Sequence, residues 1–375
     1  MKIIDQGTVF QGQTGTRTAN CCFPSIAILD DHSLRVTWRV GSSKDSSDGE
    51  IRSSRSIDGG KTWSDPTSPF PTEMDNRHGE LRYAPIARVS SGRLLAAVVW
   101  VDRSDPKLPF FNPETEGLLP TRTLFYESTN GGGAWSLVGE ADERPYNGPL
   151  LVTGPVFRLP DGRLACSCEN NKTYQDKSTW IEAALLKVSS DEGRTWSDYI
   201  IGANDPAGRF MYWDGRYAVR NGSSHSIATF WTYNHEAQKD ANLHVAFSPD
   251  GGKSWSQPSD SGISGQVTVP LFRRNGSLLV FFVDRFQTRS IRMRSIDDFS
   301  PDSPLTGHEL LIYQQPGVQT DPGSQTDSST YLQDQELWTF GRVDAIEDRI
   351  GDIWVVYYAG DRHSTGIRWC RVRQQ

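Results

Sequence analysis

One short pattern, Ser-x-Asp-x-Gly-x-Thr-Trp, recurs along the chain and constrains the fold more than any other feature. It is complete at 56–63 and 189–196, carries Ser for Thr at 248–255, and is weakened at 128–135. Internal repetition of this kind indicates an architecture built from repeated units. In such a pattern the Asp accepts backbone N–H bonds in a tight turn, the Gly supplies a positive φ and the Trp packs back between strands. We therefore expect these aspartates to brace turns and not to line a cleft.

A second repeat lies between these turns and gives the number of units. It consists of an apolar strand, a turn centred on Gly and a second apolar strand, and four of its six copies precede one of the motif turns. Asp-Gly and Asn-Gly between apolar runs are hairpin signals. The copies are 24–38, 85–100, 155–162 with the strand after it, 216–231, 269–282 and 343–358. The sequence predicts an all-β fold, a six-bladed β-propeller of four-stranded antiparallel blades. It is expected to be a single domain over 1–375, closed by pairing of the N-terminal strand with the last blade.

Composition excludes several classes of protein. The 375 residues include 12 Trp, 12 Tyr and 16 Phe, enough apolar material for a core, which argues against disorder. The net charge of -7 argues against a nucleic-acid partner, because a phosphate backbone requires a basic surface. No apolar run approaches the roughly 18 residues of a membrane span.

The cysteines and the first residues predict the compartment. Five cysteines, an odd number, fit a reducing compartment, and their pairs lack the two-residue spacer of a zinc site, so no metal or cofactor is expected. The start Met-Lys-Ile-Ile-Asp-Gln places an acid where a secretion signal would continue its apolar segment. We expect a cytoplasmic protein, although a secreted chain trimmed of its signal would look the same.

Propeller topology predicts where a ligand would bind. The connections into strand 1 and those from strand 2 to strand 3 share one face, and the motif turns mark the other. Candidate ligand residues therefore lie just before strand 1 or just after strand 2 of each blade, around the central funnel. The candidate substrate-binding residues at these places are Arg39, Arg82, Asp102, Asn170, Tyr233, His235, Asp284, Arg285 and Arg342. Carboxylates and arginines that converge on one funnel favour a sugar-binding cleft, although each Arg is also explained by a structural salt bridge.

Two glutamates are the first candidates for catalysis. Glu169 and Glu236 follow the inner hairpins of neighbouring blades, and glycoside hydrolysis needs two carboxyl groups about 5–9 Å apart. Both are also explained as rim salt bridges. Asp48, in a Gly- and Ser-rich loop, is the competing acid. The stretches 102–122, with Phe110 and Phe111, and 316–335 are expected to form pocket walls.

The repeated motif resembles the Asp-box, or BNR, repeat of the sialidase superfamily, and this resemblance covers nearly the whole chain. It implies an arginine triad for the substrate carboxylate, a tyrosine nucleophile assisted by a glutamate, and an aspartate as acid/base. Arg342 could be one retained arginine, Asp48 or Asp45 lies in the region of the aspartate, and Tyr331 lies roughly where the nucleophile would be. The run that normally carries the first arginine reads Cys-Phe-Pro at 22–24, and blade 5 enters at 267–270 without an arginine. Sialic acid itself is therefore not the expected substrate.

These observations predict a sialidase-like glycoside hydrolase that removes a terminal sugar, neutral or acidic, from a glycan or polysaccharide by a two-carboxylate mechanism. Three alternatives stay open. Exo-arabinanases share this fold and are thought to use two glutamates from neighbouring blades. A carbohydrate-binding propeller would have no catalytic activity, because fold does not fix function. A polysaccharide lyase would need a base, for which Tyr233 and His235 are candidates.

Overall fold

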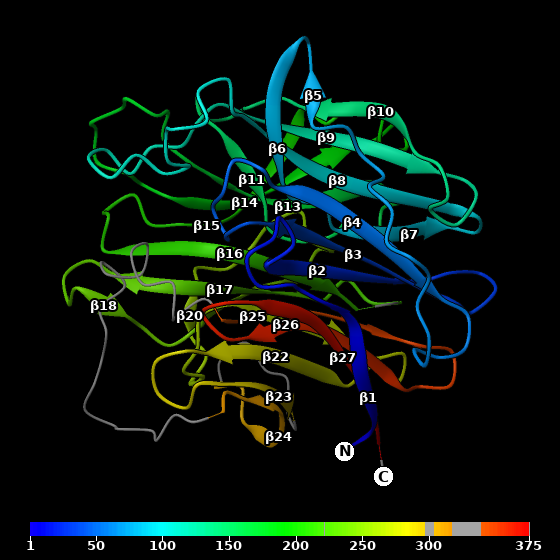
Figure 1. Cartoon of the computed structure of the whole chain (residues 1–375). Helices are drawn as coiled ribbons and strands as arrows, with labels where there is room; N and C mark the ends of the chain where they lie inside the picture. Colours follow the sequence, from blue (N-terminus) through cyan, green and yellow to red (C-terminus); the bar gives the residue numbers. More distant parts are fainter. Residues whose placement is uncertain (221, 297–303, 317–338, 375) are drawn as a thin grey trace.

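The computed structural model describes residues 1–220, 222–296, 304–316 and 339–374. Within these residues the regular elements are β-strands and no helix is present. The strands form six antiparallel sheets, the blades of a six-bladed β-propeller (Figure 1). The fold class predicted from the hairpin repeat is confirmed. In the described part of the chain, no helix has the length and apolar character needed to cross a membrane.

The first three blades follow in chain order. Blade 1 contains β2 (Asn20–Ile28), β3 (Leu34–Gly41) and β4 (Glu50–Ser56). Blade 2 contains β5 (Glu73–Met74), β6 (Arg77–Tyr83), β7 (Ile86–Ser90), β8 (Arg93–Asp102), β9 (Thr121–Ser128) and β10 (Ser136–Ala141). Blade 3 contains β11 (Leu150–Val152), β12 (Phe157–Arg158), β13 (Leu164–Asn170), β14 (Ala183–Ser189) and β15 (Asp198–Asn204).

The remaining blades complete the ring. Blade 4 contains β16 (Phe210–Val219), β17 (Ser226–Asn234), β18 (Lys239–Asp240), β19 (His244–Ser248) and β20 (Ser259–Asp260). Blade 5 contains β21 (Thr268–Phe272), β22 (Leu278–Asp284), β23 (Ser290–Ile296) and β24 (Gly307–Gln314). Blade 6 contains β25 (Phe340–Glu347), β26 (Ile353–Gly360), β27 (Thr365–Arg373) and β1 (Lys2–Gln11).

The second strand of each blade explains the continuous apolar runs in the sequence. Every residue of β3 and β22 is buried, because each blade packs against a neighbour on both faces. The five cysteines are free and buried, and they pack as small apolar side chains.

Blade 1 differs locally from the predicted four strands. Its described residues form three strands, and the fourth position is reduced to a bridge in which Ser53 and Thr67 exchange two backbone hydrogen bonds of 2.8 and 3.0 Å. Pro66 and Pro69 flank Thr67 and lack the N–H groups that a longer ladder needs.

The motif turns are braced as the sequence predicted. At the first turn, Asp58 Oδ1 accepts the Thr62 N–H at 2.9 Å, and the Thr62 hydroxyl donates to Oδ2 at 2.6 Å. The Gly60 N–H donates to Ser56 Oγ at 2.8 Å, with Gly60 at φ +83°. Asp191 and Asp250 make the same bonds in their turns. These aspartates are engaged with their own turns, away from the central funnel.

The ring closes between the two ends of the chain. β1 pairs antiparallel with β27 over Lys2–Gln11, and the two termini lie side by side in Figure 1. The sequence prediction that an N-terminal strand completes the last blade is confirmed.

Candidate functional site

A cavity of about 160 Å³ lies at the centre of the propeller, and its walls are rich in aromatic side chains. Phe23, Tyr83, Phe110, Phe111, Trp180, Trp213 and Trp231 line it. Its polar groups are few: Lys44, Arg82, Glu169, Asn171, Asp214 and Arg342. A small apolar pocket with a few convergent charged groups is typical of a ligand site.

Bulges in four innermost strands bring side chains into this cavity. The pairing register shifts in β2 between Cys22 and Ser25, in β6 between Leu81 and Tyr83, in β16 between Trp213 and Arg216, and in β25 between Gly341 and Asp344. A bulge adds a residue to one strand and re-aims a side chain. Each of these bulges contributes a lining residue: Phe23, Arg82, Asp214 and Arg342.

Three of these four residues are held in an unusual backbone conformation. Phe23 has φ +53°, Asp214 has φ +47° and Arg342 has φ +32°. Left-handed conformations at residues other than glycine cost about 1–3 kcal/mol each and cluster at functional sites. The fold therefore maintains a local strain around the cavity.

A pair of carboxyl groups lies on one side of the cavity. Glu169 is the second-last residue of β13 in blade 3, and its Oε2 accepts the backbone N–H of Asp214 at 2.8 Å. Burial, and secondarily the negative charge of Asp214, raise the pKa of Glu169 to about 8. The Asp214 carboxylate pairs with Arg342, whose Nη1 lies 2.9 Å from Asp214 Oδ1. At neutral pH the site therefore holds a protonated carboxyl, Glu169, next to the Asp214–Arg342 ion pair.

Glu182 adds a third carboxyl group behind this pair. It directly precedes β14 and is 1% exposed, and neither carboxyl oxygen accepts a hydrogen bond from a described residue. Because Glu169 lies opposite Ala184 in the ladder, Glu182 falls on the same face of blade 3 as Glu169. Burial, followed by the charges of Glu169 and Asp214, raises the pKa of Glu182 well above its usual range.

Basic groups lie on the side of blades 1 and 2. Arg82 pairs with Asp45, and its guanidinium lies 4.2 Å from the centre of the Phe110 ring. Burial lowers the pKa of Lys44 to about 8. Burial alone would raise the pKa of Asp45, but the charges of Arg82 and Lys44 outweigh it and hold this pKa well below its usual range.

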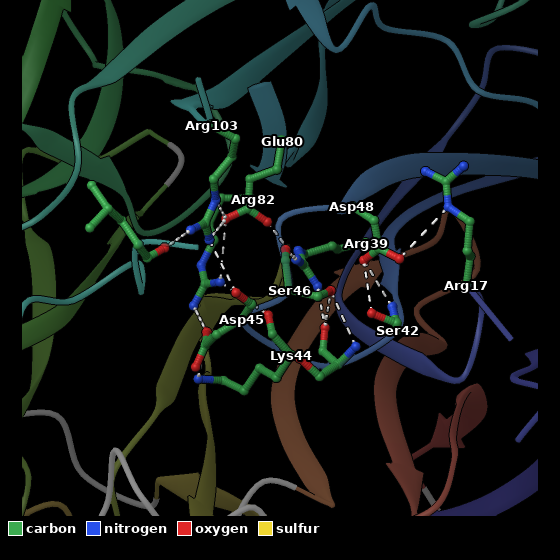
Figure 2. A network of polar contacts seen from close by, with 12 residues as sticks. Arg17, Arg39, Ser42, Lys44, Asp45, Ser46, Asp48, Glu80, Arg82 and Arg103 are labelled. Carbon is green, nitrogen blue, oxygen red and sulfur yellow. Dashed lines mark hydrogen bonds and ion pairs between the residues drawn. The ribbon is translucent and has the colours of Figure 1, made fainter. Parts of the chain in front are cut away.

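A buried network fixes the loop that carries Lys44 and Asp45 (Figure 2). Glu80 is fully buried, and its two oxygens accept hydrogen bonds of 2.5 Å, one from Arg39 and one from Arg103. Arg39 also donates to the carbonyl of Ser46 at 2.8 Å. The network therefore holds the β3–β4 loop against blade 2.

Among the residues predicted for the site, Glu169, Arg82 and Arg342 line the cavity, and so do Phe110 and Phe111 of the predicted wall. Tyr331 lies outside the described residues, as does most of the stretch 316–335.

Other predicted residues support structure around the site. Arg39 is engaged with Glu80 as described. Asp48 accepts the Ser42 N–H at 3.0 Å and lies 3.7 Å from Arg17 (Figure 2), and Asp102 pairs with Arg77 at 3.1 Å. Asn170 Oδ1 accepts the Ala183 N–H, and Asp284 accepts the N–H groups of 286–288. Arg285 is buried close to Gly341.

The expected pairing of Glu169 with Glu236 is corrected by the structure. β17 ends at Asn234, and the turn after it carries Glu236 into solvent, outside the residues that line the cavity. Tyr233 is buried and packs edge-on against His235 at 5.3 Å, and neither residue lines the cavity. The acidic residue next to Glu169 comes instead from β16: it is Asp214, whose backbone N–H donates to the Glu169 carboxyl group.

Sequence reasoning missed Asp214 and Glu182. Asp214 lies inside the innermost strand of blade 4, where alternation predicts no funnel position, and only the bulge turns it inward. The available signal was an acid beside a glycine in an aromatic strand, Trp213-Asp214-Gly215. For Glu182 the signal was a lone acid at the head of the apolar run 183–186.

Comparison with solved structures identifies the fold. A protein of unknown function from Dyadobacter fermentans is 17% identical, with a TM-score of 0.76 over 100% of this chain and 99% of that one. The intramolecular trans-sialidase from Ruminococcus gnavus is 12% identical, with a TM-score of 0.65 over 97% of this chain and 96% of that one. The chain has the sialidase fold.

A larger solved structure gives the same result. Trypanosoma rangeli sialidase is 11% identical with a TM-score of 0.63, and this chain, matched over 94% of its own length, spans 55% of that enzyme. At these identities the likeness concerns the fold alone. Neither a protein-family model nor a curated protein sequence matches the chain. Across the described residues, no three His, Cys, Asp or Glu side chains are grouped so that they could hold a metal ion.

Proposed function

We propose that this protein is a glycoside hydrolase that removes a terminal, acidic sugar from a glycan, with Glu169 as the proton donor and Asp214 as the second carboxylate. The observation that carries the proposal is the pair itself. Glu169 is half-buried at the wall of the cavity and has a pKa of about 8, and it lies beside Asp214, which pairs with Arg342. Glycoside hydrolysis requires one protonated and one ionised carboxyl group at the same bond.

The environments of the two carboxyl groups suit these two roles. The proton of Glu169 is retained at neutral pH and is available to the glycosidic oxygen as the bond breaks. Asp214 carries a negative charge that would serve as nucleophile, as base toward water, or as stabiliser of the positive charge that develops on the sugar ring. The ion pair with Arg342 orients this carboxylate.

The charge of the cavity supports an acidic sugar. Lys44, Arg82 and Arg342 line it; Arg82 pairs with Asp45 and Arg342 with Asp214, while Glu169 is neutral, which leaves one positive charge in excess. Guanidinium groups bind carboxylates through paired hydrogen bonds, so an anionic substituent on the sugar would find partners here. The aromatic walls would pack on the apolar faces of the ring.

A product screen tests the proposal. The protein is incubated with sialosides, arabinans and uronic-acid polysaccharides, and products are followed by chromatography and by ultraviolet absorbance. Release of a free monosaccharide, lost in Glu169→Gln and Asp214→Asn but kept in the exposed control Glu143→Gln, is the expected result. An unsaturated, absorbing product would instead indicate a lyase. Glycan binding without turnover in any member of the panel would indicate a binding propeller.

A further inference from the structure

A second cavity, of about 990 Å³, lies between the outer strands of blades 5 and 6, and we refer to it as the outer cleft. Blade 5 contributes the end of β24 and Arg289 of the β22–β23 loop, and blade 6 contributes parts of β1 and β27 and the turn 361–363. The loops at the equivalent place in blades 1 and 3 carry Lys44 and Asn171 to the central cavity. The outer cleft therefore opens on the same face of the propeller, and no residue that the structure describes lines both cavities.

Positive charge predominates in the outer cleft, although the whole chain has a net charge of -7. Its described lining contains three arginines, Arg289, Arg362 and Arg368, and one acid, Asp361. The Asp361 carboxylate accepts two backbone N–H groups of its own turn, at 2.7 and 3.0 Å. Asp361 is thus engaged with the turn, and the described lining keeps an excess of positive charge.

Two of these arginines, Arg289 and Arg368, form no ion pair with any residue in the described part of the chain. Arg368 is held by neutral partners instead: its Nη1 donates to Thr8 Oγ1 at 3.1 Å and its Nη2 to Gln11 Oε1 at 3.3 Å. These contacts position the guanidinium but do not neutralise its charge. Because a guanidinium has five N–H donors, it keeps others for an oxyanion.

Outside the cleft, the arginines of neighbouring positions in β23 and β27 are neutralised by acids. Arg292 and Arg294 pair with Glu309 at 3.0 and 2.6 Å, and Arg371 and Arg373 pair with Asp352 at 2.7 and 2.6 Å. The lack of acidic partners is therefore a property of the cleft and not of these strands in general.

The backbone of Arg289 is held in an unfavourable conformation. Its φ is +48°, and its carbonyl accepts the Gln315 N–H at 3.0 Å and the side-chain amide of Gln314 at 3.2 Å. Left-handed conformations at residues other than glycine cost free energy and cluster at functional sites. The end of β24 thus fixes, at a cost, the residue whose side chain lines the cleft.

Two tyrosines add an aromatic wall to the outer cleft. The ring centroids of Tyr313 and Tyr357 are 5.7 Å apart. Burial raises the pKa of both phenols, and the charge of Arg368 acts in the opposite direction on each, so its guanidinium lies close to both rings. Gln6 and Thr8 of β1 add an amide and a hydroxyl group to the lining. Guanidinium groups for acidic substituents, aromatic rings for the sugar and polar groups for its hydroxyls are thus present together.

We propose that the outer cleft is a second glycan-binding site, which binds an acidic oligosaccharide with its carboxylate or sulfate groups on Arg289 and Arg368 and its rings against the two tyrosines. The two guanidinium groups come from different blades, so they suit charges on separate sugars more than a single compact anion. The cleft is several times larger than the central cavity, which suits a longer stretch of glycan. This inference goes beyond the proposed function, because binding in the outer cleft requires no turnover.

The test is isothermal titration calorimetry at pH 7 with trigalacturonic acid, sulfated maltotriose and unmodified maltotriose. We expect at least one acidic probe to bind and maltotriose not to bind. Arg289→Gln and Arg368→Gln should each weaken that binding about tenfold or more, since each removes a partner in charge-assisted hydrogen bonds. Arg349→Gln, which changes an exposed arginine in the turn between β25 and β26, is the matched control and keeps the wild-type affinity.

The outcomes identify the recognised group and separate the two proposals. Binding of trigalacturonic acid alone assigns the cleft to carboxylates, and binding of sulfated maltotriose alone assigns it to sulfates. Unchanged affinity in both folded cleft variants, binding of neither acidic probe, or equal binding of maltotriose overturns the acidic-glycan site and leaves the hydrolase proposal intact. A protein that binds the probes through the cleft but releases no sugar supports the site and overturns the hydrolase. Circular dichroism and thermal unfolding confirm that each variant is folded.

Discussion

At the scale of single residues, Glu169 connects burial to chemistry. It is a carboxyl group that keeps its proton where most carboxyl groups are ionised, because its partial burial at the aromatic cavity disfavours the charged form and Asp214 adds a negative charge nearby. A proton donor with a pKa of about 8 is suited to work at neutral pH, and this makes the activity sensitive to alkali.

The first prediction concerns the pH dependence of turnover. Because the protonated form of Glu169 is the active one, kcat/KM should fall as pH rises through about 8. Lys44 loses its charge in the same range, since burial lowers its pKa to about 8, so the profile is repeated with Lys44→Arg, which stays charged. An alkaline limb that persists in Lys44→Arg belongs to Glu169, and Glu169→Gln should lose about 10²–10⁴-fold in kcat. A flat profile to pH 10 would exclude Glu169 as the acid.

The second prediction concerns Glu182. The folded state keeps a proton on this buried carboxyl, whereas the unfolded chain loses it near pH 4.3. Above that pH the unfolded state binds fewer protons, so the free energy of unfolding falls by up to about 1.4 kcal/mol per pH unit until the folded pKa is passed. Glu182→Gln removes this slope. In urea denaturation from pH 5 to pH 8, the free energy of unfolding of the variant should therefore rise relative to that of the wild type as the pH increases. Parallel curves, as expected for the exposed control Glu143→Gln, would refute the argument.

At the scale of elements, two innermost strands are joined by two ion pairs across the centre of the propeller. β16 carries Asp214 and Arg216, and β25 carries Arg342 and Asp344, so that each Arg pairs with the Asp of the other strand, at 2.9 and 3.1 Å. The Thr153 carbonyl of blade 3 accepts from both arginines. The Arg342–Asp214 pair lines the cavity, and the Arg216–Asp344 pair is buried beside it in the same two strands.

Asp344 is the acidic residue of the Arg216–Asp344 pair, and it connects that pair to blade 1. It is 3% exposed and also accepts the Ser25 hydroxyl at 2.7 Å and the Ile26 N–H at 3.1 Å, which ties blade 1 to blades 4 and 6. Asp344→Ala leaves the Arg216 charge buried without this partner, and we expect a loss of about 3–5 kcal/mol in the free energy of unfolding. Removal of the exposed pair by Arg88→Ala should cost at most about 1 kcal/mol in the same denaturation experiment. Equal losses in the free energy of unfolding would mean that the buried Arg216–Asp344 pair contributes no more to stability than an exposed pair.

The motif turns allow a matched comparison of a charged brace with a neutral one. In the blade 2 turn, Asn130 replaces the aspartate and still accepts the Ala134 N–H at 2.9 Å. Asp191→Asn should therefore retain most of the stability at pH 7, whereas Asp191→Ala should cost about 1–2 kcal/mol. Burial opposes the shift, but hydrogen bonds from Thr195 lower the pKa of Asp191 to about 2. The stabilisation is thus present above pH 4 and lost as pH falls toward 2.

Acid titration of the two variants checks this account. Thermal unfolding between pH 4 and pH 2 should show a smaller loss of stability for Asp191→Asn than for the wild type, because the amide does not titrate. If Asp191→Asn and Asp191→Ala were equally unstable at pH 7, the turn would depend on the charge and not on the hydrogen bonds.

At the scale of the whole molecule, the blades could be predicted from the sequence, whereas the two acidic residues Asp214 and Glu182 of the site could not. Hairpins are local, so apolar runs around Asp-Gly and Asn-Gly report them directly, and the ends of second strands such as Asp102 and Asn170 were placed correctly. Bulges depend on how six strands crowd around one axis. The inward turn of Asp214 and the outward turn of Glu236 therefore followed from packing between blades that no local pattern records.

Closure of the ring is a property of the whole molecule, and it converges on Trp369 of β27. A Cβ on Gly7 of β1 would lie 2.8 Å from Trp369 Nε1, and one on Gly60, in the motif turn of blade 1, would lie 2.6 Å from Cζ2 of the same ring. The indole is thus confined between the first strand and the first blade. Gly7→Ala should force the ring to move and cost about 1–3 kcal/mol, measured as a lower thermal midpoint. Gly133→Ala, whose Cβ would meet Asn130 at an ordinary 3.4 Å, should change the midpoint little. Equal thermal midpoints for the two variants would mean that the junction between β1 and blade 1 tolerates a shift of Trp369. Closure would then depend on the β1–β27 ladder alone.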